Sequence, residues 1–305
     1  MENRILFIVN RKAGKGKIGK NVQKIENNFK KMNYNVTTKY TTKENNAKVI
    51  ITNYQEPYDI VVACGGDGTL SEVVQGIRET KKNVAIGYIP MGTMNDFAKS
   101  MGMSFDKFDI SNNINEYEVK HCDLGAFDDR IFNYSATFGM FSKASYSADS
   151  KYKNKFGKLV YWWLAAKELF DYQSYNVKAE FDEKVIEDDF VFGCISNSKY
   201  IGGMHLFKNE SIEMDDGKFE VLFVRKPKNF FHTLKLALKV MNGNFKDEYI
   251  HYYQTSDLSV KSNSDIRWAL DGEDGGNVNN VKLHNLNRAI NYIVPKNKKK
   301  MYFSH

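Results

Sequence analysis

Residues 61–72 read Val-Val-Ala-Cys-Gly-Gly-Asp-Gly-Thr-Leu-Ser-Glu, with three glycines around one carboxylate. An apolar run precedes the glycines and a helical pattern follows them, which is typical of a buried strand, a tight turn and a helix. A simple structural turn needs one glycine, whereas three allow backbone N–H groups to approach a polyphosphate closely. The stretch therefore predicts a phosphate-binding turn after a strand, with Asp67 placed to hold a cation or to orient a neighbouring group.

Strand and helix patterns alternate on both sides of this stretch through the first hundred residues. Short glycine-containing junctions join them, which predicts a doubly wound α/β sheet with parallel strands and right-handed crossovers. In such sheets ligands bind at the carboxyl ends of the strands, where these glycine-rich loops fall. The expected strands cover residues 4–9, 34–40, 58–64 and 84–89, and the expected helices cover residues 19–32, 43–53 and 69–80.

The pattern changes after about Asp106, where short strand-like stretches joined by turns replace the alternation. We therefore expect a second, β-rich domain. The predicted domains are 1–120 (α/β), 121–290 (β-rich) and 291–305, a basic tail with the option of packing back on the first domain. The expected strands cover residues 117–122, 131–138, 175–181, 184–195, 218–224, 250–261, 266–270 and 280–294, and two expected helices cover residues 155–170 and 229–241.

The composition of the 305-residue chain, with 42% hydrophobic residues, fits a globular protein of about two domains. Its best apolar run, residues 159–166, is far shorter than the ~18 residues of a membrane-spanning helix, so we expect a cytoplasmic protein. Cys64, Cys122 and Cys194 lack the spacing of a zinc site or a disulfide set and are interpreted as buried small hydrophobic residues. The net charge of +7 favours anionic partners: nucleotide phosphates, nucleic acid or an acidic membrane surface.

A glycine-rich loop over residues 10–20 also follows an expected strand and precedes an expected helix. At such a position the backbone N–H groups and the helix dipole favour the binding of phosphate. Gly14, Gly16 and Gly19 match the dinucleotide-binding spacing, but the next strand ends without the acidic residue that would bind a ribose. The loop also nearly matches a Walker A motif, which fails at Asn21 because magnesium would need a hydroxyl there. A lysine-rich turn without a ligand is the remaining interpretation.

A third loop, Pro90-Met91-Gly92-Thr93-Met94-Asn95-Asp96-Phe97-Ala98, follows the next expected strand. It adds a hydroxyl, an amide and a second carboxylate to the same edge of the sheet. The alternative is that Thr93 or Asn95 only caps the following helix. Together the three loops predict a nucleotide-phosphate site at the carboxyl ends of the parallel strands.

Six short motifs are spread over nearly the whole chain: Asn10–Gly14, Gly65–Thr69, Pro90–Ala98, Asp123–Gly125, Asp215–Gly217 and Asp271–Glu273. Their order and spacing resemble the soluble diacylglycerol kinase family, which includes bacterial lipid kinases and sphingosine kinases. The Gly-Gly-Asp-Gly-Thr element is shared with NAD kinases and 6-phosphofructokinases, whereas Pro-x-Gly-Thr-x-Asn-Asp-Phe-Ala points to the lipid kinases. The sequence departs from the family at Ser71, where asparagine is usual, and at Arg11, where proline is usual.

The resemblance implies an α/β nucleotide-binding domain, a larger antiparallel β-sandwich domain, and ATP bound in the cleft between them. Magnesium is the implied metal. The residues implied to bind ATP come from the three loops and their surroundings: Asn10, Arg11, Lys12, Ala13, Gly14, Thr41, Gly65, Gly66, Asp67, Gly68, Thr69, Leu70, Ser71, Glu72, Gly92, Thr93 and Asn95.

The resemblance places Glu273 at the family's catalytic position, as the general base that takes the proton of the attacking hydroxyl. From the residues alone, Asp271 as the base and a plain acidic turn remain open. Asp67, Asp96 and Asp123 are implied to form a carboxylate network around magnesium and the phosphates. A helix or turn cap is the alternative role for Asp123.

An acidic tight turn at residues 214–218 is the candidate for a further metal site, because such a turn can hold a hard cation through a carboxylate and neighbouring carbonyls. The resemblance implies the side chain of Asp216 and the carbonyls of Glu213 and Lys218 as ligands, and a bare β-turn is the alternative. Lys15 and Lys158 are expected either to meet anionic lipid phosphate or to be solvated.

These expectations describe a magnesium-dependent enzyme that transfers the γ-phosphate of ATP to a lipid hydroxyl, with diacylglycerol as substrate and phosphatidic acid as product. A kinase of a soluble substrate such as NAD, and a nucleotide-binding regulatory module, are the alternatives; we expect no nucleic-acid partner. A lipid substrate requires peripheral membrane contact, for which residues 155–164 and the lysine-rich tail from Lys296 are candidates. The alternatives are that residues 155–164 form a helix packed on a core and that the tail is a solvated end. The exposed strands of a β-rich half suggest a homodimer.

Overall fold

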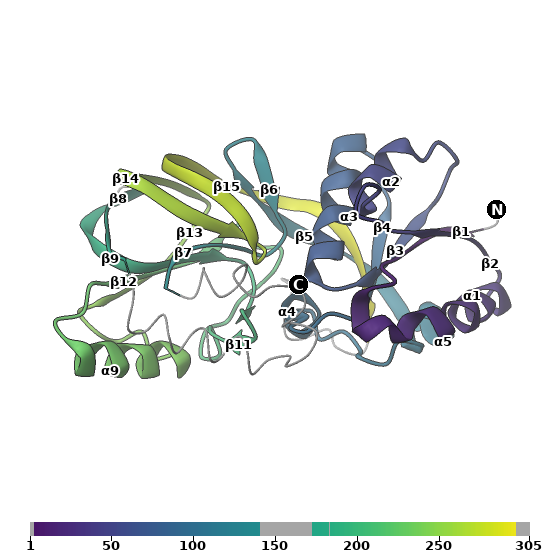
Figure 1. Cartoon of the computed structure of the whole chain (residues 1–305), viewed down its shortest axis with the longest axis horizontal. Coiled ribbons are helices and arrows are strands. Elements are labelled where there is room, and N and C mark those ends of the chain that lie inside the picture. Colours follow the sequence, from purple (N-terminus) through teal and green to yellow (C-terminus); the bar gives the residue numbers. More distant parts are fainter. Residues whose placement is uncertain (1–2, 141–172, 183, 297–305) are drawn as a thin grey trace. The chain divides into compact units, whose positions relative to one another are not determined.

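The computed structural model describes residues 3–140, 173–182 and 184–296. They form two compact units (Figure 1), which we call the first and the second unit. The first unit contains the chain up to Cys122 and its return from Arg288, and the second unit contains Asp123–Asn287. Within the described residues the chain therefore crosses between the units twice, once within strand β5 (Tyr117–Phe127) and once within strand β15 (Glu273–Pro295).

A parallel sheet forms the centre of the first unit, as predicted. Its strand order is β15-β4-β3-β1-β2, and every pairing in it is parallel. Val9 lies opposite both Tyr40 and Cys64, and Gly65 lies opposite Pro90, so the three glycine-rich loops begin at the same edge of the sheet. The bounds of the strands are β1 Asn3–Val9, β2 Tyr34–Tyr40, β3 Ile60–Gly65 and β4 Ala85–Pro90.

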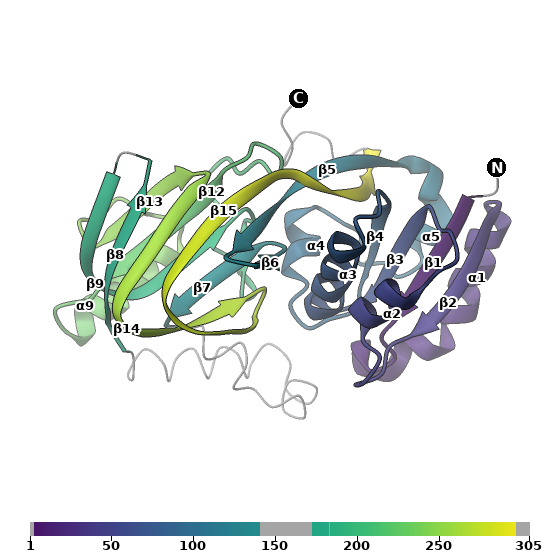
Figure 2. The ribbon, with the colours of Figure 1, turned by 90° about the horizontal axis from the view of Figure 1, so that it is seen from above.

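Helices cover both faces of this sheet. In Figure 1 helices α2 (Ala47–Asn53) and α3 (Asp67–Thr80) lie on one face, and α1 (Val22–Lys31) and α5 (Asp109–Asn113) lie on the other; in Figure 2 α2 and α3 lie in front of the strands. The helix expected over residues 19–32 is divided, because the glycine-rich stretch 13–20 forms a tighter 3₁₀ helix before α1 begins. Two short helices, α4 (Asp96–Ser100) and η2 (Ile114–Glu116), complete the unit.

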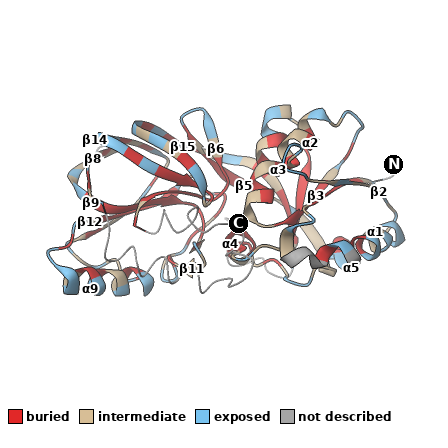
Figure 3. Cartoon of the chain, viewed as in Figure 1, coloured by how far each residue is buried: buried red, intermediate tan, exposed pale blue. Residues whose placement is uncertain are grey.

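The second unit is an antiparallel β structure, which confirms the predicted β-rich half. Its sheet runs β13-β12-β9-β7-β14-β15, and β8 pairs with both β9 and β14. Because β9 and β14 each pair with β7 and also with β8, the sheet curls around an apolar interior, which Figure 3 shows as buried. The strands are β6 Arg130–Phe132, β7 Ser135–Gly139, β8 Tyr175–Phe181, β9 Lys184–Ser196, β10 Tyr200–Ile201, β11 Met204–His205, β12 Phe219–Arg225, β13 Ile250–Thr255 and β14 Asp257–Leu270.

Aromatic side chains fill the interior of the curled sheet. The ring of Phe138 lies 4.9 Å from that of Trp268 and 5.9 Å from that of Phe223, measured between centroids. All three are fully buried. Such large apolar side chains dominate the burial free energy of a core, so this cluster packs β7, β12 and β14 together across the interior of the curled sheet.

Several segments of the second unit differ from the predicted ones in their bounds, and the strand expected over residues 131–138 is divided into β6 and β7. A strand was expected over residues 250–261, but β13 ends at Thr255 and β14 begins at Asp257 after a sharp turn. The next strand begins at Glu273 rather than at residue 280, so the Asp-Gly-Glu motif forms a tight hairpin rather than part of a longer connection between the expected strands 266–270 and 280–294. The helix expected over residues 155–170 lies outside the described residues, whereas the helix expected over 229–241 is confirmed as α9 (Phe230–Met241).

Candidate functional site

Backbone hydrogen bonds join the three glycine-rich loops of the first unit. The N–H of Gly14 in the first loop donates to the carbonyl of Met91 in the third loop, with an N···O distance of 2.8 Å. The N–H of Met91 donates in turn to the carbonyl of Gly65 in the second loop, at 2.7 Å. Gly14 has a φ of +60°, a conformation that glycine adopts without strain. The sequence predicts that these loops lie at the same edge of the parallel sheet, and the structure shows that hydrogen bonds connect them into one surface.

Two glycines allow the second and third loops to touch through their backbones. A Cβ atom on Gly92 would lie 2.7 Å from the Cα of Gly66, a distance that real Cβ atoms essentially never show. A Cβ atom on Gly65 would similarly lie 2.4 Å from the Oγ1 of Thr69. The glycines therefore have a packing role as well as the predicted role of opening the backbone to phosphate.

Two asparagines hold the loops in place with their side-chain amides. Nδ2 of Asn10 donates to Oγ1 of Thr69 at 3.1 Å, and Oδ1 of Asn10 accepts from the N–H of Lys12 at 3.0 Å. Oδ1 of Asn95 accepts from the N–H of Gly92 at 2.7 Å. The side chain of Asn95 makes no capping hydrogen bond to α4, so it shapes the third loop rather than acting as a cap.

Asp67 and Asp96 come together at the start of α3 and α4. The Asp67 carboxylate accepts from the N–H groups of Asp96 and Phe97, at 3.3 and 3.4 Å. Burial, together with the nearby charge of Asp96, raises the pKa of Asp67 to about 7. Asp96 is itself buried and pairs with Nζ of Lys99 at 2.8 Å. A cation at this place would therefore favour the ionised form of Asp67.

The chemistry of these donors fits a magnesium ion that is bound together with a nucleotide. Among the described residues, no three acidic, histidine or cysteine side chains converge closely enough to form a metal site by themselves. Magnesium commonly binds through one or two carboxylates together with water and substrate phosphates, and it needs no all-protein cage. Asp67 is the carboxylate that would contribute such a ligand, because it lies where the glycine-rich loops meet α3 and α4.

Lys99 is a residue of this site that the sequence interpretation missed. Its ammonium group is mostly buried and pairs with Asp96 one helical turn before it. The signal was present in the sequence as an acidic and a basic residue spaced three apart, which places the two on the same face of a helix. This spacing is common on solvated helices, so only the burial of the pair distinguishes it.

In the second unit, hydrogen bonds to Asp123 stabilise the acidic turn at residues 214–218. Oδ2 of Asp123 accepts from the N–H of Gly217 at 2.7 Å, and Oδ1 accepts from Nδ2 of Asn287 at 2.9 Å. Nδ2 of Asn287 also donates to the carbonyl of Asp215, at 3.1 Å. Asp123 therefore holds this turn in a fixed conformation. Asn287 is a second residue that the sequence interpretation missed, because it lies in a strand rich in asparagine where no spacing distinguishes it.

Asp216 and Lys218, two of the residues expected to hold a second metal ion, lie on this turn, and Glu213 directly precedes it. Oδ1 of Asp216 accepts from the N–H of Lys218 at 3.0 Å. Burial raises the pKa of Asp216, and the charges of Asp123 and Glu213 raise it further. These neighbouring negative charges would stabilise a bound cation. The charge of the turn is therefore compatible with the expected metal site.

Asp271 and Glu273 occupy different environments although they are two residues apart. The Asp271 carboxylate is buried and accepts from the N–H groups of Asn133, Tyr134 and Ser135, at 2.7, 2.8 and 3.2 Å. Glu273 is exposed and is the first residue of β15. The geometry gives Asp271 the role of anchoring the hairpin and leaves the Glu273 carboxylate available to a substrate.

The other residues expected to bind ATP surround the three loops. The guanidinium of Arg11 lies over the ring of Tyr40, 3.7 Å from its centroid. The N–H of Thr41 donates to the carbonyl of Val9 at 3.0 Å, which places Thr41 beside the start of the first loop. Oε2 of Glu72 accepts from the N–H of Ala47 at 3.0 Å, so this carboxylate holds the start of α2. Ala13 begins the 3₁₀ helix, Gly68, Thr69, Leu70 and Ser71 lie in the first turns of α3, and Thr93 lies in the third loop.

The two lysines expected to meet a lipid phosphate remain predictions. The backbone of Lys15 lies in the 3₁₀ helix, and its side chain lies outside the described part of the structure. Lys158 also lies outside the described residues, together with the aromatic segment 155–164 and the tail beyond Lys296.

Comparison with known proteins finds a family model that matches each unit. The family model of the diacylglycerol kinase catalytic domain matches residues 4–127, and the model of the YegS C-terminal NAD kinase beta sandwich-like domain matches residues 135–293. The chain belongs to the bacterial diacylglycerol kinase and lipid kinase family. Membership of this kinase family implies the use of ATP.

Relatives of similar length extend along nearly the whole chain. A diacylglycerol kinase of Staphylococcus saprophyticus is 27% identical over 93% of this chain and 94% of its own length. One of Bacillus subtilis is 26% identical over 97% of each chain. A solved structure of a diacylglycerol kinase from Bacillus anthracis has a TM-score of 0.75 at 20% identity, covering 96% of this chain and 97% of its own. These comparisons support the two-unit fold and the kinase family.

Proposed function

We propose that this protein transfers the γ-phosphate of ATP to the free hydroxyl of diacylglycerol, giving phosphatidic acid and ADP. The observation that carries the proposal is the connected surface of three glycine-rich loops beside Asp67 and Asp96, in a chain whose first unit matches the diacylglycerol kinase catalytic domain. The names of the relatives in Staphylococcus and Bacillus support diacylglycerol as the substrate.

Phosphoryl transfer depends mainly on positioning and on neutralising charge. The backbone N–H groups of Gly65–Thr69, at the N-terminus of the 14-residue helix α3, would bind the nucleotide phosphates. Asp67 would hold magnesium, which neutralises phosphate charge when bound. Lys99 keeps Asp96 in place beside Asp67 through their ion pair.

Glu273 is the proposed general base. Its carboxylate would accept the proton of the lipid hydroxyl as the hydroxyl oxygen bonds to the γ-phosphorus and the bond from that phosphorus to the bridging oxygen of ADP breaks. Asp271 would act as a positioning residue, because its carboxylate already accepts three backbone N–H groups. Asp123 would act indirectly as well, by fixing the turn that carries Asp216, where we propose a structural magnesium ion.

Phosphate transfer from labelled ATP tests the proposal. Diacylglycerol, monoacylglycerol, a sphingosine-like base and a prenol would be presented in mixed micelles, with NAD as a soluble substrate. NAD is included because the second unit matches a domain described as NAD kinase beta sandwich-like. We expect diacylglycerol to be labelled most rapidly, and labelling of NAD without any lipid would contradict the proposal.

The variant Glu273→Gln separates catalysis from binding. We expect kcat on diacylglycerol to fall roughly 10²–10⁴-fold with ATP affinity nearly unchanged, because the amide cannot accept the proton. Asp274→Asn is the matched control, since Asp274 is an exposed acid of the same hairpin. Equal turnover by the Glu273 variant and the control would exclude Glu273 as the base.

A further inference from the structure

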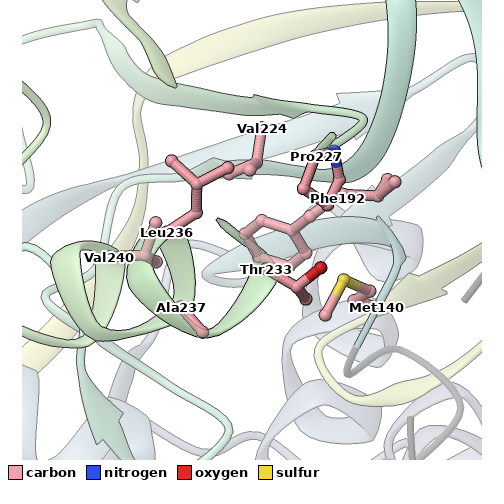
Figure 4. A pocket seen from close by; sticks show the side chains of 9 residues that line it. Met140, Phe192, Val224, Pro227, Thr233, Leu236, Ala237 and Val240 are labelled. Atoms are coloured by element: carbon pink, nitrogen blue, oxygen red, sulfur yellow. The ribbon is translucent and has the colours of Figure 1, made fainter. Parts of the chain in front are cut away.

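Helix α9 in the second unit is attached to the curled sheet by its inner face. Figure 4 shows Leu236 and Val240 of α9 pointing toward Phe192 of β9 and Val224 of β12. Leu236 and Val240 are buried. The cavity that remains between helix and sheet has a volume of only about 30 Å³, so the helix is packed closely against its support. Its start is held as well, because Oδ1 of Asn229 accepts from the N–H of His232 at 3.0 Å.

The opposite face of α9 is apolar too, although it is exposed. Phe231 is 80% exposed, Leu238 is 52% exposed, and Leu234 and Met241 lie on the same face at helical spacing. This helix carries five of the eight exposed large hydrophobic side chains found among the described residues. Single exposed apolar residues are ordinary, whereas a concentration on one element marks a contact surface.

The charges around this face are mostly positive, although Asp247 and the exposed Glu248 follow the helix in sequence. The sequence of α9, Phe-Phe-His-Thr-Leu-Lys-Leu-Ala-Leu-Lys-Val-Met, contains two lysines and no acidic residue. Lys235 lies beside Phe231, Leu234 and Leu238 around a shallow depression of the surface. Three further exposed lysines lie in the segments on either side of the helix: Lys226, Lys228 and Lys246. Lys239 forms an ion pair with Asp247 at 2.7 Å, so it contributes less to the positive field.

We propose that the outer face of α9, defined by Phe231, Leu234, Lys235 and Leu238, docks on an anionic lipid bilayer. The apolar side chains enter the boundary between headgroups and acyl chains, and the lysines contact lipid phosphates. A second copy of the chain is a poorer occupant, because a two-fold contact through this face would bring Lys235 and its neighbouring lysines against the same residues of the partner. The inference rests on the proposed function, since a kinase of a membrane lipid must reach its substrate at the bilayer.

Vesicle sedimentation tests the docking face without requiring catalysis. Wild-type protein would be mixed with phosphatidylglycerol vesicles and with phosphatidylcholine vesicles at low and high salt. The double variant Phe231→Ser/Leu238→Ser removes two exposed apolar groups, and Phe105→Ser is the matched control because Phe105 is 55% exposed in a loop of the first unit. We expect the double variant to lose at least tenfold in partition onto phosphatidylglycerol, and the control to bind as the wild type does.

The lysine variants test the electrostatic part. Lys228→Gln/Lys235→Gln should weaken partition onto phosphatidylglycerol by roughly fivefold per lysine at low salt, with a smaller difference at high salt. Equal binding of the wild type to both kinds of vesicle would overturn the anionic preference. Unchanged binding by Phe231→Ser/Leu238→Ser would overturn the docking face, and so would a dimer of the wild type that this variant dissociates in analytical ultracentrifugation.

A water-soluble, short-chain diacylglycerol separates this inference from the proposed function. The α9 variants should phosphorylate that substrate at the wild-type rate and fail only on vesicle-borne diacylglycerol. If no lipid is phosphorylated by the wild type while vesicle binding still depends on Phe231 and Leu238, the proposed function fails and the docking face stands. If lipid is phosphorylated equally by wild type and α9 variants on vesicles, the docking face fails and the function stands.

Discussion

Asp271 and Glu273 show how one short acidic motif divides two tasks between neighbouring residues. The sequence offered both carboxylates as proton acceptors, because both follow a strand and flank a glycine. Asp271 and Gly272 have φ values of +51° and +80°, which is the backbone of a two-residue hairpin turn of the Asp-Gly type. This turn points the Asp271 carboxylate at three backbone N–H groups of the segment 133–135. Only burial distinguishes the two acids, and no sequence spacing reports burial at a single position.

The anchoring role of Asp271 can be measured as stability. Asp271→Ala would leave three buried N–H donors without their acceptor, and each unsatisfied buried donor costs about 1–3 kcal/mol. We expect the free energy of unfolding in urea to fall by roughly 3–5 kcal/mol. Asp274→Ala on the same hairpin removes an exposed carboxylate and should change it by less than about 1 kcal/mol. Equal stability of the two variants would exclude the anchoring role.

Glu220 is a buried carboxylate in β12 that makes stability depend on pH. Its Oε1 accepts from Nε2 of Gln254 at 2.9 Å, whereas its Oε2 has no hydrogen-bond partner in the described structure. Burial raises the pKa of Glu220 from the usual 4.5 to about 8, with the charge of Asp216 adding to the effect. Between these two values the folded chain keeps a proton that the unfolded chain releases, so rising pH favours unfolding.

We therefore expect the free energy of unfolding to fall as the pH rises from about 4.5 to about 8. Each pKa unit is worth about 1.4 kcal/mol, so the loss assigned to Glu220 is on the order of 5 kcal/mol. Glu220→Gln keeps a polar side chain of similar shape without the proton, and should flatten this part of the profile. Glu248→Gln, at an exposed position, should leave the slope as it is in the wild type. Urea unfolding at several pH values checks both expectations, and equal slopes in all three proteins would contradict them.

At the scale of elements, the first unit was predictable because its signals are local. Period-2 and period-3.6 patterns gave the parallel strands and the helices, and glycines marked the loops that follow β1, β3 and β4. The strand bounds and pairings of the second unit were harder to predict from the sequence. The curl that β9 and β14 impose depends on pairings between residues far apart in the sequence. The early start of β15 depends on the tight pairing of Glu273 with Leu270 across the Asp-Gly turn. A turn residue such as Ser256 carries no strong signal, so two strands were expected to be continuous.

The close contact between the second and third loops can be tested by adding a methyl group at Gly92. Gly92→Ala would place a methyl group 2.7 Å from the Cα of Gly66, and backbone atoms can move apart only if the loops separate. We expect a loss of about 1–3 kcal/mol in stability and at least tenfold in ATP affinity, because the phosphate-binding surface would be distorted. Urea unfolding and calorimetric titration with ATP measure the two effects.

Gly19→Ala is the control for this variant. A Cβ atom on Gly19 would meet nothing within 4 Å, and Gly19 is not in the left-handed region. We expect it to bind ATP with wild-type affinity and to be at least as stable. If Gly92→Ala binds ATP as Gly19→Ala does, the close approach of the two loops has no part in nucleotide binding.

At the scale of the whole molecule, the first unit is built from both ends of the chain. Asn291 and Tyr292 of β15 pair in parallel with Ala85 and Ile86 of β4, so the last described strand completes a sheet that the first hundred residues begin. The sequence showed a strand near residue 292 but not its partner, because pairing over such a separation leaves no local pattern. The domain division between Cys122 and Asp123, and again between Asn287 and Arg288, follows from this return.

Tyr292 fixes the returning strand in the first unit, and its loss should weaken that unit selectively. The ring is fully buried, with its centroid 4.6 Å from that of Phe97 at the start of α4. Tyr292→Ala would leave a cavity, and deleting a large buried aromatic side chain costs about 3–5 kcal/mol. Hydrogen exchange should therefore show lost protection in β3 and β4, with β8 and β12 of the second unit protected as in the wild type. Tyr292→Phe keeps the ring and should retain most of the protection. If Tyr292→Ala lowers protection equally in both units, they unfold as one cooperative body and the returning strand stabilises the whole chain rather than the first unit alone.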